Sequence, residues 1–147
     1  MTDYYKTSYI SGLIKMQPSI ELFFKSDSYA VIGASTNRDK FGNKVLRCYQ
    51  QNNKTVYPVH PVETEIEGIN CYKSVNELPN DVKSISIITP PNLTEKIVDQ
   101  AHAKGITNIW MQPGAQSDLA IQKCYDYGIN VIADGSCILV VLGFPDH

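Results

Sequence analysis

The stretch from Tyr29 to Phe41 constrains the fold of this chain more than any other segment. It reads YAVIGASTNRDKF: a short apolar run that is typical of a buried strand, then a glycine, then small or hydrogen-bonding residues. Apolar residues at helical spacing follow, namely Phe41, Val45, Leu46 and Tyr49. This order predicts a strand, a tight turn and the first turn of a helix.

A turn of this kind is suited to binding phosphate. Backbone N–H groups and the positive end of the helix dipole point to one place, and Gly33 lets a ligand approach the backbone closely. Polar and basic residues crowd the same turn: Ser35, Thr36, Asn37, Arg38 and Lys40. The alternative is an ordinary strand-to-helix turn without a ligand, but these side chains favour a phosphate site.

The composition indicates one globular domain. The chain has 147 residues, of which 43% are hydrophobic and 19% charged, with a formal net charge of -2. This charge argues against a nucleic-acid binder, and no apolar run is long enough to span a membrane. The cysteines form no C-x-x-C pair, which argues against a metal site, and their scatter is typical of free thiols in the reducing cytoplasm.

Residues 1–16 differ from the rest of the chain. They are polar and rich in tyrosine, and they lack the apolar core of a signal peptide. We therefore expect a loosely ordered leader at 1–16 and a single domain at 17–147. Pro18 and the apolar residues after it predict a short helix that covers part of the sheet.

The remaining sequence alternates between strand and helix patterns. Strands are expected at 29–32, 55–59, 83–89, 107–111 and 129–133. Between them we expect Ser74 and Glu77 to form a capping box, Asn92 to cap a helix and Gly105 to end that helix. The alternation predicts an α/β fold with a doubly wound, mainly parallel five-stranded sheet and helices on both faces.

Two familiar nucleotide-binding motifs are missing. The turn lacks the G-x-G-x-x-G pattern, and the second strand ends at Val59, His60 and Pro61 without an acid that could bind a ribose. The Gly-Lys-Ser/Thr of a P-loop is absent as well. The sequence thus argues against NAD and, more strongly, against a P-loop enzyme. His60 is either a ligand contact or a structural histidine.

Several short motifs, in their order and spacing, resemble those of the CoA-binding domain family. They are V-I-G-A-S at 31–35, Phe41-Gly42, Y-P-V-H-P at 57–61, T-P-P at 89–91, W-M-Q-P-G-A at 110–115 and D-G-S-C at 134–137. The resemblance covers the chain from about Ser28 to Val140. Members are small Rossmann-like proteins, similar to the amino-terminal domain of the succinyl-CoA synthetase alpha subunit and of NDP-forming acyl-CoA synthetases.

This resemblance implies that CoA or an acyl-CoA lies across the carboxyl ends of the strands. The implied contact residues are Gly33, Ala34, Ser35 and Thr36 at the phosphates, Arg38 and Lys40 as charges, Val59, His60 and Pro61 along the nucleotide, Thr89, Pro90 and Pro91 on the other wall, and Gln112 and Pro113 from the fourth strand. The family often has asparagine at the position of His60.

The missing acid after the second strand agrees with CoA, because a pyrophosphate and a ribose phosphate favour helix-start N–H groups and cations. We expect a cytoplasmic CoA- or acyl-CoA-binding protein with no catalytic residues of its own, acting as a homo-oligomer or beside a catalytic partner subunit. Two alternatives stay open. One is an NAD(P)-binding redox sensor or reductase, with Arg38 and Lys40 at the NADP phosphate; the other is a small CoA-thioester enzyme that uses Cys137.

Overall fold

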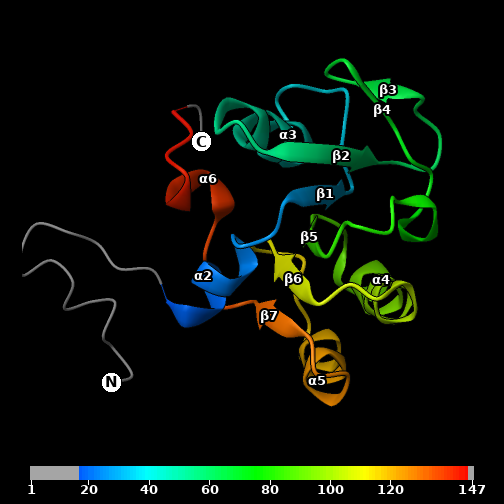
Figure 1. The fold of residues 1–147 in the computed structure, drawn as a ribbon, viewed down its shortest axis with the longest axis vertical. Helices are drawn as coiled ribbons and strands as arrows, with labels where there is room; N and C mark the ends of the chain where they lie inside the picture. The colour runs from blue at the N-terminus through cyan, green and yellow to red at the C-terminus, as the bar shows by residue number, and fades with distance from the viewer. Residues whose placement is uncertain (1–16, 146–147) are drawn as a thin grey trace, which may run out of the picture.

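A parallel five-stranded sheet forms the centre of the structure (Figure 1), a computed structural model that describes residues 17–145. The strands are β1 (Ser28–Ile32), β2 (Thr55–Val59), β5 (Ser84–Ile87), β6 (Asn108–Met111) and β7 (Asn130–Ile132). They lie in the order β2-β1-β5-β6-β7, and all neighbouring pairs are parallel. The α/β fold expected from the sequence is confirmed.

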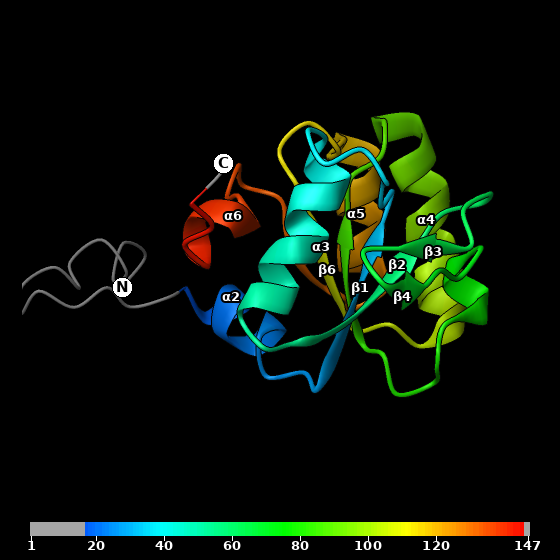
Figure 2. The same ribbon diagram turned by 90° about the horizontal axis from the view of Figure 1, so that it is seen from above.

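Helices cover both faces of this sheet, as Figure 2 shows. One face carries α2 (Pro18–Phe23), α3 (Phe41–Gln51) and α6 (Ile138–Val141), and the other carries α4 (Pro91–Lys104) and α5 (Asp118–Asp126). Each side has its own core, because alternate residues of a strand point to opposite faces. All residues of β1, β5 and β6 are buried, which explains the apolar runs YAVI of β1 and IWM of β6; the two serines of β5 are buried as well.

The path of the chain creates a crevice beside β1. From β1 the chain passes through α3 to β2 on one side, and from β5 it passes through α4 to β6 on the other. Because α3 and α4 lie on opposite faces, the chain leaves the carboxyl ends of β1 and β5 in diverging directions. Ligands of open α/β sheets bind at such a switch point.

A small hairpin follows β2, between the second and third strands that the sequence predicts. It consists of β3 (Glu65–Ile66) and β4 (Ile69–Asn70), joined by Glu67 and Gly68 with φ angles of 51° and 79°. Positive φ at both central residues is what a tight hairpin turn of this type requires. After the hairpin, Tyr72 pairs with the end of β2, which brings residues 73–75 to the carboxyl edge of the sheet.

One predicted helix start and one predicted capping box are wrong, although Ser74 is the residue before a short helix, as expected. Helix α4 begins at Pro91 with Pro90 as its N-cap residue, so Asn92 lies inside the first turn; proline already has the backbone angle that a first turn needs. Ser74 forms no cap hydrogen bond through its side chain, and the segment after it is a short 3-10 helix, η2 (Val75–Glu77). Gly105 does end α4, in a left-handed conformation with φ 90°.

The expected leader, residues 1–16, lies outside the described residues. Within the described range, no helix is long and apolar enough to cross a membrane.

A hydroxyl pair connects α3 to the sheet inside the core. The hydroxyl oxygens of Tyr49 and Ser86 lie 2.6 Å apart, and both side chains are fully buried. Burial raises the pKa of Tyr49 well above its usual value, so the phenol stays protonated. The Tyr49 ring also stacks on Tyr29, with ring centroids 5.0 Å apart.

We expect that removing one partner of this pair destabilises the fold more than removing both. Tyr49→Phe leaves the Ser86 hydroxyl buried and unpaired, which costs about 1–3 kcal/mol of unfolding free energy. Tyr49→Phe combined with Ser86→Ala should recover part of that loss. Urea denaturation measures both variants, with the exposed Tyr125→Phe as a control that changes stability by less than about 0.5 kcal/mol. If the double variant lost as much stability as Tyr49→Phe and Ser86→Ala lose separately, added together, the pairing would be contradicted.

Candidate functional site

A cleft of about 800 Å³ opens at the carboxyl ends of β1, β2 and β5. It lies at the switch point of the sheet, and its volume is in the range of small-molecule binding sites. Four segments form its walls: the turn between β1 and α3, the end of β2, residues 73–75, and the start of α4 with the turn before it.

The cleft brings together most of the contact residues that the sequence indicated. These are Gly33, Ala34, Ser35, Lys40, Val59, His60, Pro61, Thr89 and Pro90. Thr36, Arg38, Pro91, Gln112 and Pro113 do not line it. Sequence reasoning missed Lys73 and Ser74, which reach the cleft because Tyr72 pairs with β2. It also missed Leu93 and Gln100, which line the cleft from α4.

The turn after β1 is packed too tightly for side chains at its glycines. A Cβ atom at Gly33, which has φ 93°, would lie 2.5 Å from the carbonyl oxygen of Ile88. A Cβ atom at Gly42, in the first turn of α3, would overlap the carbonyl oxygen of Gly33. The glycines therefore let the start of α3 lie directly against the backbone of the turn.

Part of the expected N–H cradle is already used within the protein. The N–H groups of Gly33 and Ala34 both donate to the carbonyl oxygen of Val59, at 3.2 and 3.3 Å. Among the described residues, the N–H groups of Ser35 and Thr36 donate to no backbone carbonyl, and neither do those of Phe41 and Gly42 at the start of α3. Those of Asn37 and Asp39 donate to the side chains of Ser35 and Asn37. Helix α3 has 11 residues, so its dipole adds a positive potential at the same place.

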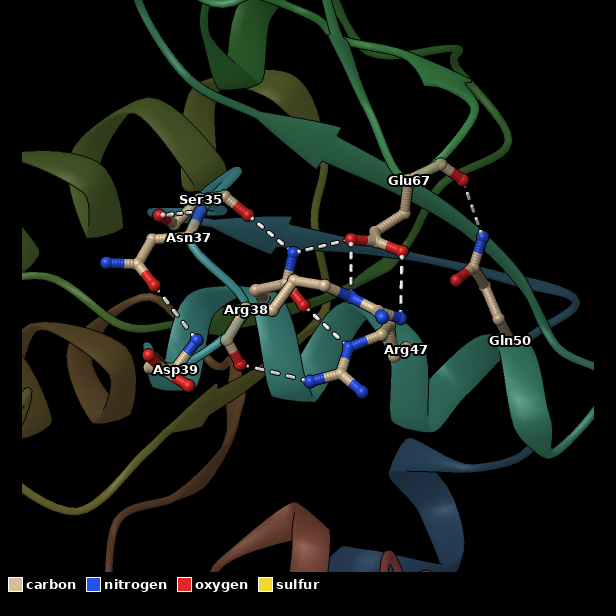
Figure 3. A network of polar contacts seen from close by, with 8 residues as sticks. Ser35, Asn37, Arg38, Asp39, Arg47, Gln50 and Glu67 are labelled. Atoms are coloured by element: carbon tan, nitrogen blue, oxygen red, sulfur yellow. Dashed lines mark hydrogen bonds and ion pairs between the residues drawn. The ribbon is translucent and has the colours of Figure 1, made fainter. Parts of the chain in front are cut away.

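A side-chain network holds this turn from behind (Figure 3). Asn43 is fully buried; its Nδ2 donates to the carbonyl oxygen of Ser35 and to Oε2 of Glu67, both at 2.9 Å. The backbone carbonyl of Glu67 accepts from Nε2 of Gln50 at 3.1 Å. Because Glu67 belongs to the turn of the β3–β4 hairpin, these contacts fasten the hairpin to α3 and to the candidate phosphate turn.

Arg38 takes part in this network. Its Nε lies 3.3 Å from Oε2 of Glu67, and its Nη2 donates to Oε1 of the same residue at 3.4 Å. Figure 3 shows its side chain directed toward Glu67. The sequence placed the charge of Arg38 at a ligand phosphate, whereas the structure pairs it with a carboxylate outside the cleft. Lys40 lines the cleft instead.

Gln112 connects two other motifs. The side chain is 3% exposed; its Oε1 accepts from the Ile138 N–H at 2.9 Å and its Nε2 donates to Sγ of Cys137 at 3.3 Å. Nε1 of Trp110 donates to the carbonyl oxygen of Ser136 at 2.9 Å. The W-M-Q-P-G-A and D-G-S-C motifs therefore hold the loop before α6 in place.

The cysteines provide no nucleophile in the cleft. Burial raises the pKa of Cys48 to about 11 and that of Cys124 to about 12, so both stay protonated. Cys137 does not line the cleft, and its side-chain contact is the amide of Gln112 rather than a base. Among the described residues, no group of three or more His, Cys, Asp or Glu side chains is placed to hold a metal ion.

Comparison with known proteins gives this site a context. Residues 27–143 match a family model described as CoA binding domain. The ADP-forming acetate–CoA ligase of Methanocaldococcus jannaschii is 34% identical over 79 residues, which cover 54% of this chain and 11% of the ligase. The alpha subunit of ADP-forming acetate–CoA ligase II of Pyrococcus furiosus is 32% identical over 91 residues, covering 61% of this chain and 20% of the subunit.

The chain thus corresponds to a fifth or less of the length of these relatives. A solved structure of similar extent also matches. It is a conserved hypothetical protein from Pyrococcus furiosus with 37% sequence identity and a TM-score of 0.74, and the match covers 78% of this chain and 97% of that one.

We expect Gly42→Ala to destabilise the protein, although glycine to alanine in a helix ordinarily adds about 0.5–1 kcal/mol of stability. The added methyl group overlaps the Gly33 carbonyl oxygen, so the helix start must shift, which costs about 1–3 kcal/mol. Urea denaturation provides the measurement. Gln51→Ala, at the exposed end of the same helix, serves as the control. Increased stability of Gly42→Ala would show that α3 does not depend on this close approach.

Proposed function

The chain belongs to the CoA-binding domain family, and we propose that its cleft binds coenzyme A or an acyl-CoA. The observation that carries this proposal is the glycine-tight turn after β1, which lies at the cleft beside the start of α3. A pyrophosphate there would meet the N–H groups of Ser35 and Thr36 and the positive end of the helix dipole.

The charges of the cleft also favour an anionic ligand. Lys40 lies on the turn before α3, and Lys73 comes from the segment after the hairpin; both side chains are exposed where they line the cleft. Asp39 is the one carboxylate among the lining residues. A cleft with this balance attracts phosphate groups.

We also propose that the chain does not carry out a reaction alone. The matched relatives are named as acetate–CoA ligases, and the matching region is a small part of their length. No hydrogen bond between described residues joins a serine, threonine or cysteine of the cleft to His60, so a nucleophile with its base is not assembled there. A partner subunit, or further copies of this chain, would then supply the chemistry in the cytoplasm.

The two alternatives have less support in the structure. For an NADP-binding protein, Arg38 and Lys40 were expected at the phosphate; Glu67 engages Arg38, whereas Lys40 still lines the cleft. A small CoA-thioester enzyme would use Cys137 as its nucleophile, and Cys137 is not among the residues that line the cleft.

A thermal-shift titration with CoA, acetyl-CoA, NAD and NADP tests the proposal. We expect CoA or acetyl-CoA to raise the melting temperature, because a ligand at 100 times its Kd adds about 2.7 kcal/mol to the stability of the folded state. NAD should give no shift. A shift with NADP alone would point to a redox protein, and a CoA concentration series without any shift would reject the CoA site.

Ser35→Glu should abolish the CoA-dependent shift, because it places a carboxylate where the phosphates must lie. Ala103→Glu adds the same charge on an exposed position of α4 away from the cleft, and it should retain the shift. Gly33 is unsuitable for this test, since any side chain there collides with Ile88.

Arg38 and Lys40 should differ in their effect on ligand affinity. Lys40→Gln removes a cation that lines the cleft, and we expect CoA to bind about fivefold more weakly, a loss of ~1 kcal/mol. Arg38→Gln removes the ion pair with Glu67 and should change the Kd by less than about twofold. Isothermal titration calorimetry measures both. A larger loss for Arg38→Gln would mean that the guanidinium leaves Glu67 and binds the ligand.

A further inference from the structure

We propose that His60 is a specificity-determining residue of the cleft, whose ring is fixed as the Nε2–H tautomer and donates a hydrogen bond to an acceptor atom of the bound nucleotide. The identity of the ligand rests on the function proposed above. The tautomer is a property of the protein without its ligand and can be tested separately.

The hydrogen bonds at His60 determine which ring nitrogen carries the proton. Nδ1 lies 3.0 Å from the backbone nitrogen of Val62 and 3.1 Å from that of Glu63, and both N–H groups point at it. Backbone N–H groups can only donate, so Nδ1 is the acceptor and carries no proton. In the neutral imidazole the proton then belongs to Nε2.

The backbone of His60 is held as firmly as its ring. Its N–H group donates to the carbonyl oxygen of Tyr72 at 2.9 Å, next to the bridge between Val59 and Tyr72. The residue is therefore fixed at the end of β2 by pairing along the edge of the sheet, and its side chain has little freedom to turn away from the 60–63 turn.

Nε2 is left for the ligand. It lies on the side of the ring opposite Nδ1, it forms no hydrogen bond to any described residue, and the half-buried ring lines the cleft. Lys40 and Lys73 line the same cleft, so the groups that face the ligand are mainly donors. A matching ligand presents an acceptor at His60, such as a phosphate oxygen, a ribose oxygen or an adenine ring nitrogen.

The turn itself suggests the variants that test this role. Donation from the N–H groups two and three residues ahead is the pattern that asparagine and aspartate form in turns. Asparagine at position 60 offers an acceptor, its amide oxygen, to the turn and a donor, its N–H group, to the ligand. Its roles therefore match those of Nδ1 and Nε2–H of His60. Aspartate offers the same oxygen to the turn, but it presents a second acceptor and a negative charge to the ligand.

The tautomer is measured first, by long-range ¹H–¹⁵N NMR of the imidazole rings in the free protein. The chain has three histidines, so His102→Gln and His147→Gln variants identify the signals of His60. We expect a protonated Nε2 and an unprotonated Nδ1, and a change of the His60 signals when CoA is added. An Nδ1–H tautomer, or an even mixture of both, would overturn the inference even if CoA binds.

The donor role is then measured by calorimetry with CoA on His60→Asn and His60→Asp. We expect His60→Asp to weaken binding about tenfold or more, and His60→Asn to weaken it far less. His102→Asp, at an exposed position of α4, adds the same charge as a control. Melting temperatures show whether each variant is folded. If His60→Asp is not folded, the wild-type NMR signals test the contact: a change of the His60 signals on addition of CoA supports it, and unchanged signals reject it.

Dephospho-CoA identifies the acceptor. If the penalty of His60→Asp disappears with this ligand, His60 donates to the ribose phosphate; if it persists, the acceptor is elsewhere on the nucleotide. Unchanged CoA affinity in His60→Asp would reject the donor role while leaving the CoA site intact. Absence of CoA binding by the wild-type protein would instead reject the proposed function, and the tautomer measurement would still stand.

Discussion

The contact between the first turn of α3 and the backbone after β1 determines the shape of the cleft. Gly42 has no side chain, so the helix start can lie against the Gly33 carbonyl oxygen. The next residue, Asn43, then reaches the Ser35 carbonyl and Glu67 from a fully buried position. A larger residue at position 42 would separate the helix from the turn, and the helix dipole and the unpaired N–H groups would no longer point to one place.

The connection between β2 and β5 contributes to the site from two directions. At its hairpin turn, Glu67 supports the candidate phosphate turn through Asn43 and engages Arg38. A few residues later, the pairing of Tyr72 with β2 brings Lys73 and Ser74 to the opposite wall of the cleft. One stretch of chain therefore both holds the turn in position and forms the wall of the cleft in front of it, which couples the hairpin to the shape of the cleft.

Local patterns were sufficient for the strands and for one side of the site. The run YAVI is apolar and SISII is rich in isoleucine because both faces of the central strands are buried, and glycine or proline follows them. The pattern failed at the start of α4: Asn92 has the chemistry of a cap, but Pro90 and Pro91 begin the helix two residues earlier. The hairpin was missed because Glu67, with φ 51°, adopts a conformation that a sequence pattern favours only for glycine, asparagine or aspartate.

The sequence by itself determined the order of strands and helices, the glycine-tight turn after β1 and the resemblance to CoA-binding domains, because these depend on neighbouring residues and their spacing. Only the tertiary structure decided which partners each polar side chain has and whether it lines the cleft. Arg38 and Lys40 are two residues apart, yet one pairs with Glu67, 29 residues further along the chain, and the other lines the cleft. Gln112 binds the loop before α6 and does not line the cleft, and two backbone N–H groups of the turn after β2 donate to Nδ1 of His60. The direction and partners of a side chain depend on contacts between distant segments, which spacing along the sequence does not encode.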